Sequence, residues 1–111
     1  MVVLHIIEKP PYKQSYADSC ERKNVAKYKN ALIENAKKTF KSPLPRTVKI
    51  KLAIKYRRSQ GKADSLNIIG GIGDALQKIA YFNDRQIVEV HYIEEIGERD
   101  EYWVEIRTLQ T

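Results

Sequence analysis

This 111-residue sequence contains three aspartates spaced ten residues apart, Asp64, Asp74 and Asp84. Their carboxylates are the first candidates for a chemical role. Two carboxylates that meet at one point can hold Mg²⁺, an ion that prefers oxygen ligands and keeps several waters. On a straight helix Asp74 lies about 15 Å from Asp64, too far to share one ion with it. The candidate pair is therefore Asp64 with Asp84. The alternative roles are a helix N-cap for Asp64 and a turn for Asp84.

Three of the five glycines, Gly70, Gly71 and Gly73, interrupt the helical pattern that follows Asp64. A dinucleotide-binding fingerprint starting at Gly71 would need glycine where Leu76 stands, and no Gly-Lys-Ser/Thr follows for a phosphate loop. Glycine inside a helix costs about 1 kcal/mol relative to alanine. The cluster therefore indicates close approach to the backbone by another helix, a second subunit or a nucleic-acid strand, or else tight packing on a sheet.

The same segment predicts an amphipathic helix. Its apolar residues fall within an arc of about 120°; they are Ile68, Ile69, Ile72, Ala75, Leu76 and Ile79. The opposite side carries Asn67, Gly71, Asp74 and Lys78, with Gly70 beside them. On this wheel the glycines leave the polar side of the helix bare.

The remaining elements give the order β-α-β-α-β-β. Strands are expected at 2–7, 47–56, 86–94 and 101–109, and the first helix at about 18–40. In 47–56 apolar residues alternate with lysines, which predicts a half-buried strand with a lysine ladder on its open face. We expect one α+β domain spanning residues 1–111, with two helices packed on a mixed sheet.

Charge is unevenly distributed along the chain, whose net charge is +6. Residues 1–62 hold 16 Lys/Arg and 4 Asp/Glu, whereas residues 63–111 hold 4 and 10. This asymmetry indicates a polyanionic partner and an acidic site, although a basic surface without a partner is the alternative. The candidate nucleic-acid contacts are Lys9, Lys13, Arg22, Lys23, Arg57, Arg58 and Lys62, interleaved early on with Tyr12 and Tyr16, which would stack on bases or pack the loop.

Two further observations concern the compartment. No apolar run approaches the roughly 18 residues that span a bilayer, so no membrane partner is expected. Cys20 is the single cysteine and has no internal disulfide partner. Together these features indicate a reducing, cytoplasmic compartment.

The stretch "KADSLNIIGGIGDALQKIAYFNDRQIVEVHYIEE" resembles the core of the RusA family of Holliday-junction resolvases. That family carries Asp-x-Asp-Asn-x-x-Lys at a helix start, then Asp-Ala-Leu, an Asp-Asp pair and a strand. Matching positions in this sequence are Asp64, Asn67, Asp74-Ala75-Leu76 and Asn83-Asp84. The resemblance implies an endonuclease that depends on Mg²⁺, with Mn²⁺ as the alternative metal. It also implies a homodimer that cuts four-way DNA junctions by paired nicking in recombination and repair.

The resemblance implies Asp64 and Asp84 as the catalytic and metal-binding residues, with Asn67, Asp74 and Asn83 in supporting positions. Leu66 stands where the family has a second metal-binding Asp, Gly70 where it has a catalytic Lys, and Asn83 where it has the first Asp of the pair. An active but altered nuclease and a degenerate relative that binds branched DNA without cutting it are both consistent with these departures. A basic module that binds RNA or protein is a third hypothesis.

Overall fold

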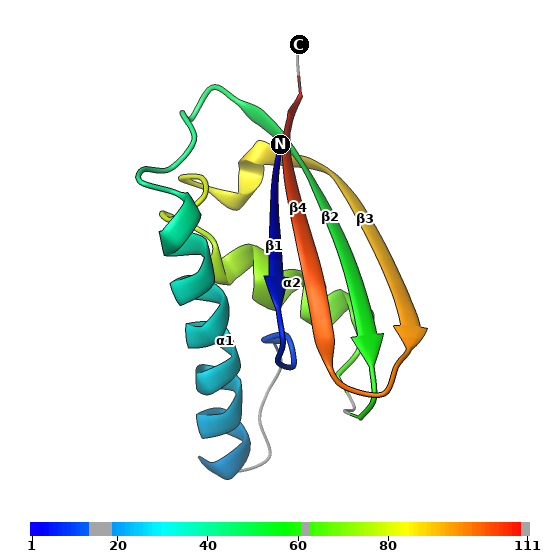
Figure 1. Ribbon diagram of the computed structural model, residues 1–111. Helices are drawn as coiled ribbons and strands as arrows, with labels where there is room; N and C mark the ends of the chain where they lie inside the picture. Colours follow the sequence, from blue (N-terminus) through cyan, green and yellow to red (C-terminus); the bar gives the residue numbers. More distant parts are fainter. Residues whose placement is uncertain (14–18, 61–62, 110–111) are drawn as a thin grey trace.

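The computed structural model describes residues 1–13, 19–60 and 63–109 of the chain (Figure 1). Its elements are β1 (Val2–Ile6), α1 (Ser19–Thr39), β2 (Lys49–Arg58), α2 (Ser65–Ala75), a 3-10 turn η1 (Asp84–Gln86), β3 (Ile87–Ile96) and β4 (Glu101–Leu109). The predicted α+β class and the order β-α-β-α-β-β are confirmed. No helix in the described part of the chain is both long and apolar enough to cross a membrane.

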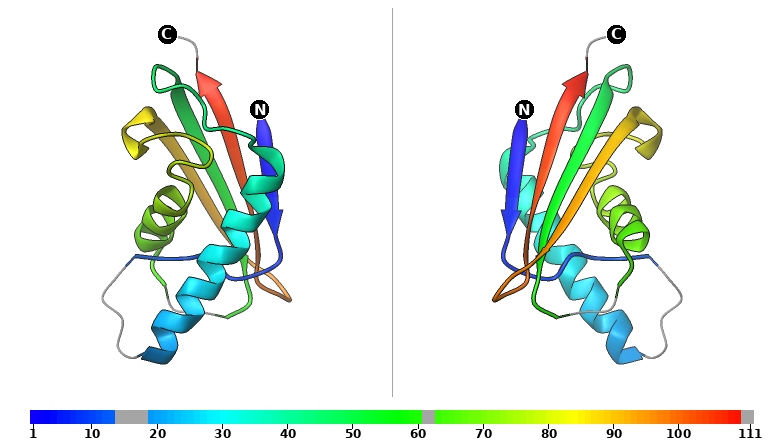
Figure 2. Two further views of the ribbon diagram at one scale, coloured as in Figure 1. Left: turned by 90° about the vertical axis from the view of Figure 1, so that its left-hand side faces the viewer. Right: turned by 90° about the vertical axis from the view of Figure 1, so that its right-hand side faces the viewer.

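The four strands form one mixed sheet in the order β1-β4-β2-β3. β4 pairs antiparallel with β1 and with β2, whereas β2 and β3 are parallel and are joined by the α2 crossover. Both helices cover the same face of the sheet, so the other face is free of helices (Figure 2). β3 forms the edge of the sheet beside α2.

β2 follows the predicted alternation. Ile50, Leu52, Ile54 and Tyr56 are at most 2% exposed and face the helices. The intervening positions, including the lysine ladder, face the other way. The strand begins and ends two residues later than expected, because Arg57 and Arg58 continue to pair with β3.

α2 buries its predicted apolar face but is shorter than the helical wheel assumes. Ile68 and Ile72 are fully buried, whereas the helix ends at Ala75. Lys78 has a left-handed φ of 68°, which a continuing right-handed helix does not allow. The expected helical placement of Lys78 and Ile79 is therefore wrong.

The polar side of α2 is not bare at Gly71, contrary to the prediction. Gly71 is buried, and the residues that cover it belong to the segment that follows β1. The close approach that the glycines indicated is thus made by the chain's own N-terminal region, not by the sheet. This crossing fixes the N-terminal region against the middle of α2.

Candidate active site

The segment Pro10–Lys13 crosses directly over α2. A Cβ atom built on Gly71 would lie 2.6 Å from Tyr12 Cα and 2.6 Å from the carbonyl carbon of Pro11. The backbone amide of Lys13 donates a hydrogen bond of 3.0 Å to the carbonyl oxygen of Asn67. Only a residue without a side chain fits at position 71, so glycine is what allows the two backbones to touch.

Beside this crossing is an open hollow, which we call the carboxylate hollow. It is lined by Lys13, Leu52, Ile69, Gly70, Gly73, Asp74, Asp84, Ile87 and Val90. Leu52 and Val90 are paired neighbours on β2 and β3, so the hollow lies over the parallel pair at the sheet edge. The absence of side chains at Gly70 and Gly73 keeps it open. The structure thus brings two of the predicted acids and one predicted DNA-binding lysine around a common space.

Asp84 reaches this hollow from the start of η1. The preceding residue, Asn83, caps the turn: its side chain accepts from the amide of Arg85 at 2.8 Å, and Gln86 bonds back to the Asn83 amide at 3.1 Å. Gln86 is 5% exposed and also donates to the carbonyl oxygen of Val48 at 3.0 Å. This buried glutamine ties the turn that carries Asp84 to the entry of β2. Asn83 therefore holds the turn, and it does not line the carboxylate hollow.

Asp74 reaches the hollow from the last turn of α2. Gln77 donates to one carboxylate oxygen at 3.2 Å, and Lys29 of α1 lies 3.6 Å from the other. No local sequence pattern points to Lys29, because this pair joins two separate helices. The Asp74 side chain remains 42% exposed, which leaves it open to a further ligand.

Tyr81 is fully buried and is hydrogen-bonded to the last turn of α2. Its hydroxyl donates to the carbonyl oxygen of Gly73 at 2.5 Å. Burial raises the pKa of Tyr81, and the nearby charges on Asp84 and Asp74 raise it further. The phenol therefore stays protonated and keeps donating, which holds the end of α2 in place.

Asp64 lies outside the carboxylate hollow. It occupies the N-cap position of α2, is exposed, and makes no side-chain capping hydrogen bond. Ten residues of helix, a rise of about 15 Å, separate it from Asp74. Its neighbour Leu66 is 79% exposed and offers no oxygen ligand. Within one chain, Asp84 therefore lines a common hollow with Asp74, and its partnership with Asp64 stays a prediction.

The ligand set around the hollow is suited to a hard cation with a partial protein shell. The described residues contain no group of three or more His, Cys, Asp or Glu side chains that could hold a metal ion. Asp74 and Asp84 supply carboxylate oxygens, which Mg²⁺ and Mn²⁺ accept together with waters and substrate phosphate oxygens. Two carboxylates at an open hollow fit such an ion.

A second hollow lies near the start of α2. Three tyrosines and two basic residues contribute to its lining. The lining residues are Lys9, Pro10, Tyr12, Tyr28, Tyr56, Arg58, Ala63 and Ile68. Arg58 donates to the carbonyl oxygen of Ala63 at 2.7 Å and to Glu94 at 2.9 Å. Tyr12 donates to Glu21 at 2.9 Å, so this tyrosine helps to pack the loop. Lys9 and Arg58 therefore line one hollow, and their contact with DNA stays a prediction.

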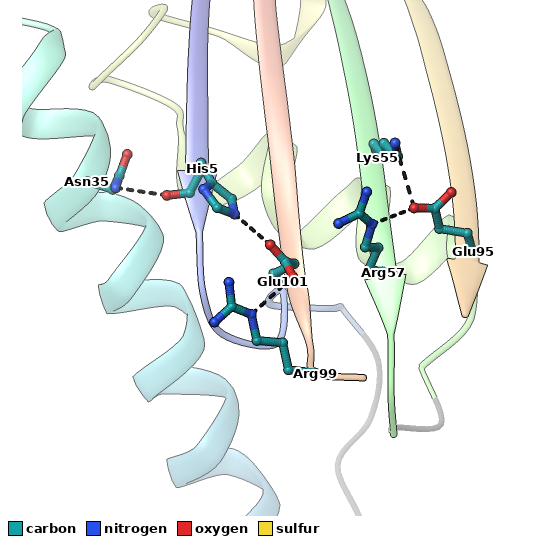
Figure 3. A network of polar contacts seen from close by, with 7 residues as sticks. All are labelled: His5, Asn35, Lys55, Arg57, Glu95, Arg99 and Glu101. Atoms are coloured by element: carbon teal, nitrogen blue, oxygen red, sulfur yellow. Dashed lines mark hydrogen bonds and ion pairs between the residues drawn. The ribbon is translucent and has the colours of Figure 1, made fainter. Parts of the chain in front are cut away.

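Arg57 points to the opposite, helix-free face of the sheet. It forms an ion pair of 2.5 Å with Glu95 of β3, and Lys55 lies 3.6 Å from the same carboxylate (Figure 3). The Arg57 guanidinium also lies 4.9 Å from the centre of the Trp103 ring. Glu95 thus compensates this part of the lysine ladder, and Arg57 and Arg58 point to opposite faces of the sheet.

Two more of the predicted contacts, Arg22 and Lys23, lie in α1. Arg22 and Lys23 are in its first turns, and Lys23 faces the same side of the helix as Lys27 and Asn30. Lys62 and Tyr16 lie outside the described residues. The basic side chains therefore occur on several surfaces.

The family model of endodeoxyribonuclease RusA matches residues 8–107. The chain belongs to the RusA family. No match was found among the curated proteins. The matched range contains the crossing segment, α2, η1 and all three aspartates. Membership implies endodeoxyribonuclease activity on branched DNA in general, and RusA resolvases generally depend on a divalent metal.

Proposed function

We propose that this RusA-family chain hydrolyses phosphodiester bonds of four-way DNA junctions at the carboxylate hollow, with Mg²⁺ or Mn²⁺ as cofactor. The observation that carries the proposal is that Asp74 and Asp84 line one open hollow together with Lys13. We further propose that the chain acts as a homodimer, so that two such sites make paired nicks on a symmetric substrate.

In this mechanism Asp84 and Asp74 would hold the metal ion. A bound divalent ion supplies Lewis-acid polarisation of the phosphate and lowers the pKa of a coordinated water. Gln77, which donates to Asp74, fixes the orientation of that carboxylate. Lys29 balances part of its charge, so two acids can share the hollow at lower electrostatic cost. Gly70 and Gly73 leave room for a phosphate to enter.

A cleavage assay with a labelled four-way junction tests the proposal. We expect metal-dependent, paired cuts in the junction and little cutting of linear duplex of the same sequence. The Asp84→Asn variant should lose cleavage, whereas Glu98→Gln, an exposed acid in the β3–β4 turn, should cut as wild type does. A protein that binds the junction but cuts nothing with Mg²⁺ or Mn²⁺ would contradict the nuclease proposal and support the degenerate binder that Leu66 and Gly70 suggest.

Basic residues on the two faces of the sheet are expected to contribute differently to DNA binding. Lys9 lies on the helix-covered side and Arg57 on the helix-free side, where Glu95 neutralises it. We expect Lys9→Gln to weaken junction binding and to lower the slope of log K against log salt by about 0.9, the loss of one phosphate contact. Arg57→Gln should leave that slope unchanged. Titrations over a range of salt concentrations measure both, and equal effects would place DNA across both faces.

A further inference from the structure

We propose that Lys13 supplies the cation that contacts the scissile phosphate, reaching the hollow from the crossing segment over Gly70. This inference rests on the proposed function and assigns a catalytic role to a residue for which the sequence suggested only general DNA binding. It also gives a reason for glycine at position 70, where the resemblance leads one to expect a lysine.

The backbone of Lys13 is fixed to α2. Its amide donates to the carbonyl oxygen of Asn67, and the two preceding residues touch the backbone of Gly71. Pro11 is fully buried, so the approach to Lys13 is anchored on the core side. The point from which this side chain starts is therefore set by packing and not by a free loop.

The stem of Lys13 lies in the space that a side chain at position 70 would use. A Cβ atom on Gly70 would be 3.4 Å from Lys13 Cδ, 3.8 Å from its Cβ and 3.9 Å from its Cγ. Three carbons of one side chain thus run along the bare backbone of α2. Contacts along the stem restrict the rotamers of a long side chain, which lowers the entropy lost when its ammonium group binds a ligand.

Lys13 lines the same hollow as both carboxylates, those of Asp74 and Asp84, and it is exposed. Asp74 already has a cationic neighbour, Lys29 of α1. A second lysine beside these acids suits a ligand that brings negative charge with it, as a phosphate does. A phosphate that approaches the two carboxylates would pass this ammonium, which is a compact point charge able to follow the charge that develops during hydrolysis.

The key variant is Lys13→Met, which keeps an unbranched stem along Gly70 and removes the charge. We expect its single-turnover cleavage of a four-way junction to fall about 100-fold, the effect of losing one preorganised donor. Its melting temperature should match that of wild type. Lys41→Gln, at an exposed lysine beyond the end of α1, is the matched control and should cut as wild type does.

A rescue experiment tests the position of the charge directly. In a Lys13→Ala background the space above Gly70 is empty, so Gly70→Lys can extend its own side chain into the hollow. We expect the double variant to cut at least about 10-fold faster than Lys13→Ala alone, as restoring a charge-assisted contact would predict. Gly70→Ala in the same background should give no recovery. A double variant no faster than Lys13→Ala would overturn the inference, and so would wild-type cleavage by Lys13→Met.

A second readout needs neither metal nor cleavage. In EDTA, Lys13→Met should lower the salt dependence of junction affinity by about 0.9, while Lys41→Gln leaves it unchanged. If wild type cuts junctions and Lys13→Met cuts equally well, the role of Lys13 is wrong and the proposed function stands. If wild type cuts nothing, the proposed function fails. An unchanged salt slope for Lys13→Met then rejects the phosphate contact as well, and a lowered slope supports it.

Discussion

Replacing Gly71 with alanine is expected to destabilise the protein by about 1–3 kcal/mol, the usual cost of forcing extra atoms into a packed interior. In an exposed helix the same change would stabilise it by about 1 kcal/mol. Here the new methyl group would lie 2.6 Å from Tyr12 Cα and 2.6 Å from the carbonyl carbon of Pro11. These are backbone atoms of an anchored segment, so they cannot rotate away as the end of a flexible side chain could.

Gly73→Ala is the matched control on the same helix. A Cβ atom on Gly73 would meet only the Tyr81 hydroxyl at 3.9 Å and Ile87 Cδ1 at 4.0 Å, both ordinary contacts. This variant should therefore be neutral or up to about 1 kcal/mol more stable. Thermal unfolding measures both, because 1 kcal/mol corresponds to a shift of about 4 °C in a domain of this size. Equal melting temperatures for the two variants would mean that the crossing segment does not rest on Gly71.

The crossing also links stability to the site. The contacts at Gly71 hold the backbone of Pro11 and Tyr12, and the next residue along the chain is Lys13. A shift of this segment would move the base of the Lys13 side chain relative to Asp74 and Asp84. Gly71→Ala is thus expected to slow junction cleavage at temperatures where the variant is still folded. Gly73→Ala would place a methyl group in the lining of the hollow itself, so it serves as a control for stability and not for cleavage.

Sequence periodicity predicted the elements whose environment is local. The alternation from Val48 to Tyr56 identified the buried face of β2, and the spacing of Ile68 and Ile72 identified that of α2. These patterns depend on which way successive side chains point, and neighbouring residues determine that direction. The order of helices and strands was predictable for the same reason, since each element is identified by its own local pattern.

Contacts between distant segments could not be predicted in this way. No side chain fits at position 71 because of the backbone of Pro11, which lies sixty residues earlier in the sequence. The helical wheel placed Lys78 on α2, but its left-handed φ lets the chain turn back. That turn brings Asp84 to the side of Asp74, a neighbour that the spacing of the two residues did not reveal. The sequence identified the acids as candidates and left open which of them meet.

The largest effect on activity is expected from Asp84→Asn, because the proposed function makes Asp84 a metal ligand whether the ion is shared with Asp74 or with Asp64. Loss of a group that merely orients a metal ligand costs 10–100-fold, so removal of a ligand should lower cleavage by at least about 100-fold. Junction binding in EDTA should be unchanged or tighter, since one carboxylate near the phosphates is neutralised. Asp74→Asn should behave similarly if Asp74 and Asp84 share the ion. Wild-type cleavage by Asp84→Asn would place the chemistry elsewhere.

Asp64 is tested by mixing subunits. Asp64 lies at the far end of α2 from Asp74, so Asp64 and Asp84 would share an ion only between two chains of the proposed homodimer. In that arrangement Asp64→Asn and Asp84→Asn are each inactive, but a mixed dimer contains one intact site and nicks one strand. If Asp74 and Asp84 of the same chain hold the ion, Asp64→Asn retains cleavage. Inactivity of both variants without recovery on mixing would instead require all three acids in one chain, which the length of α2 argues against.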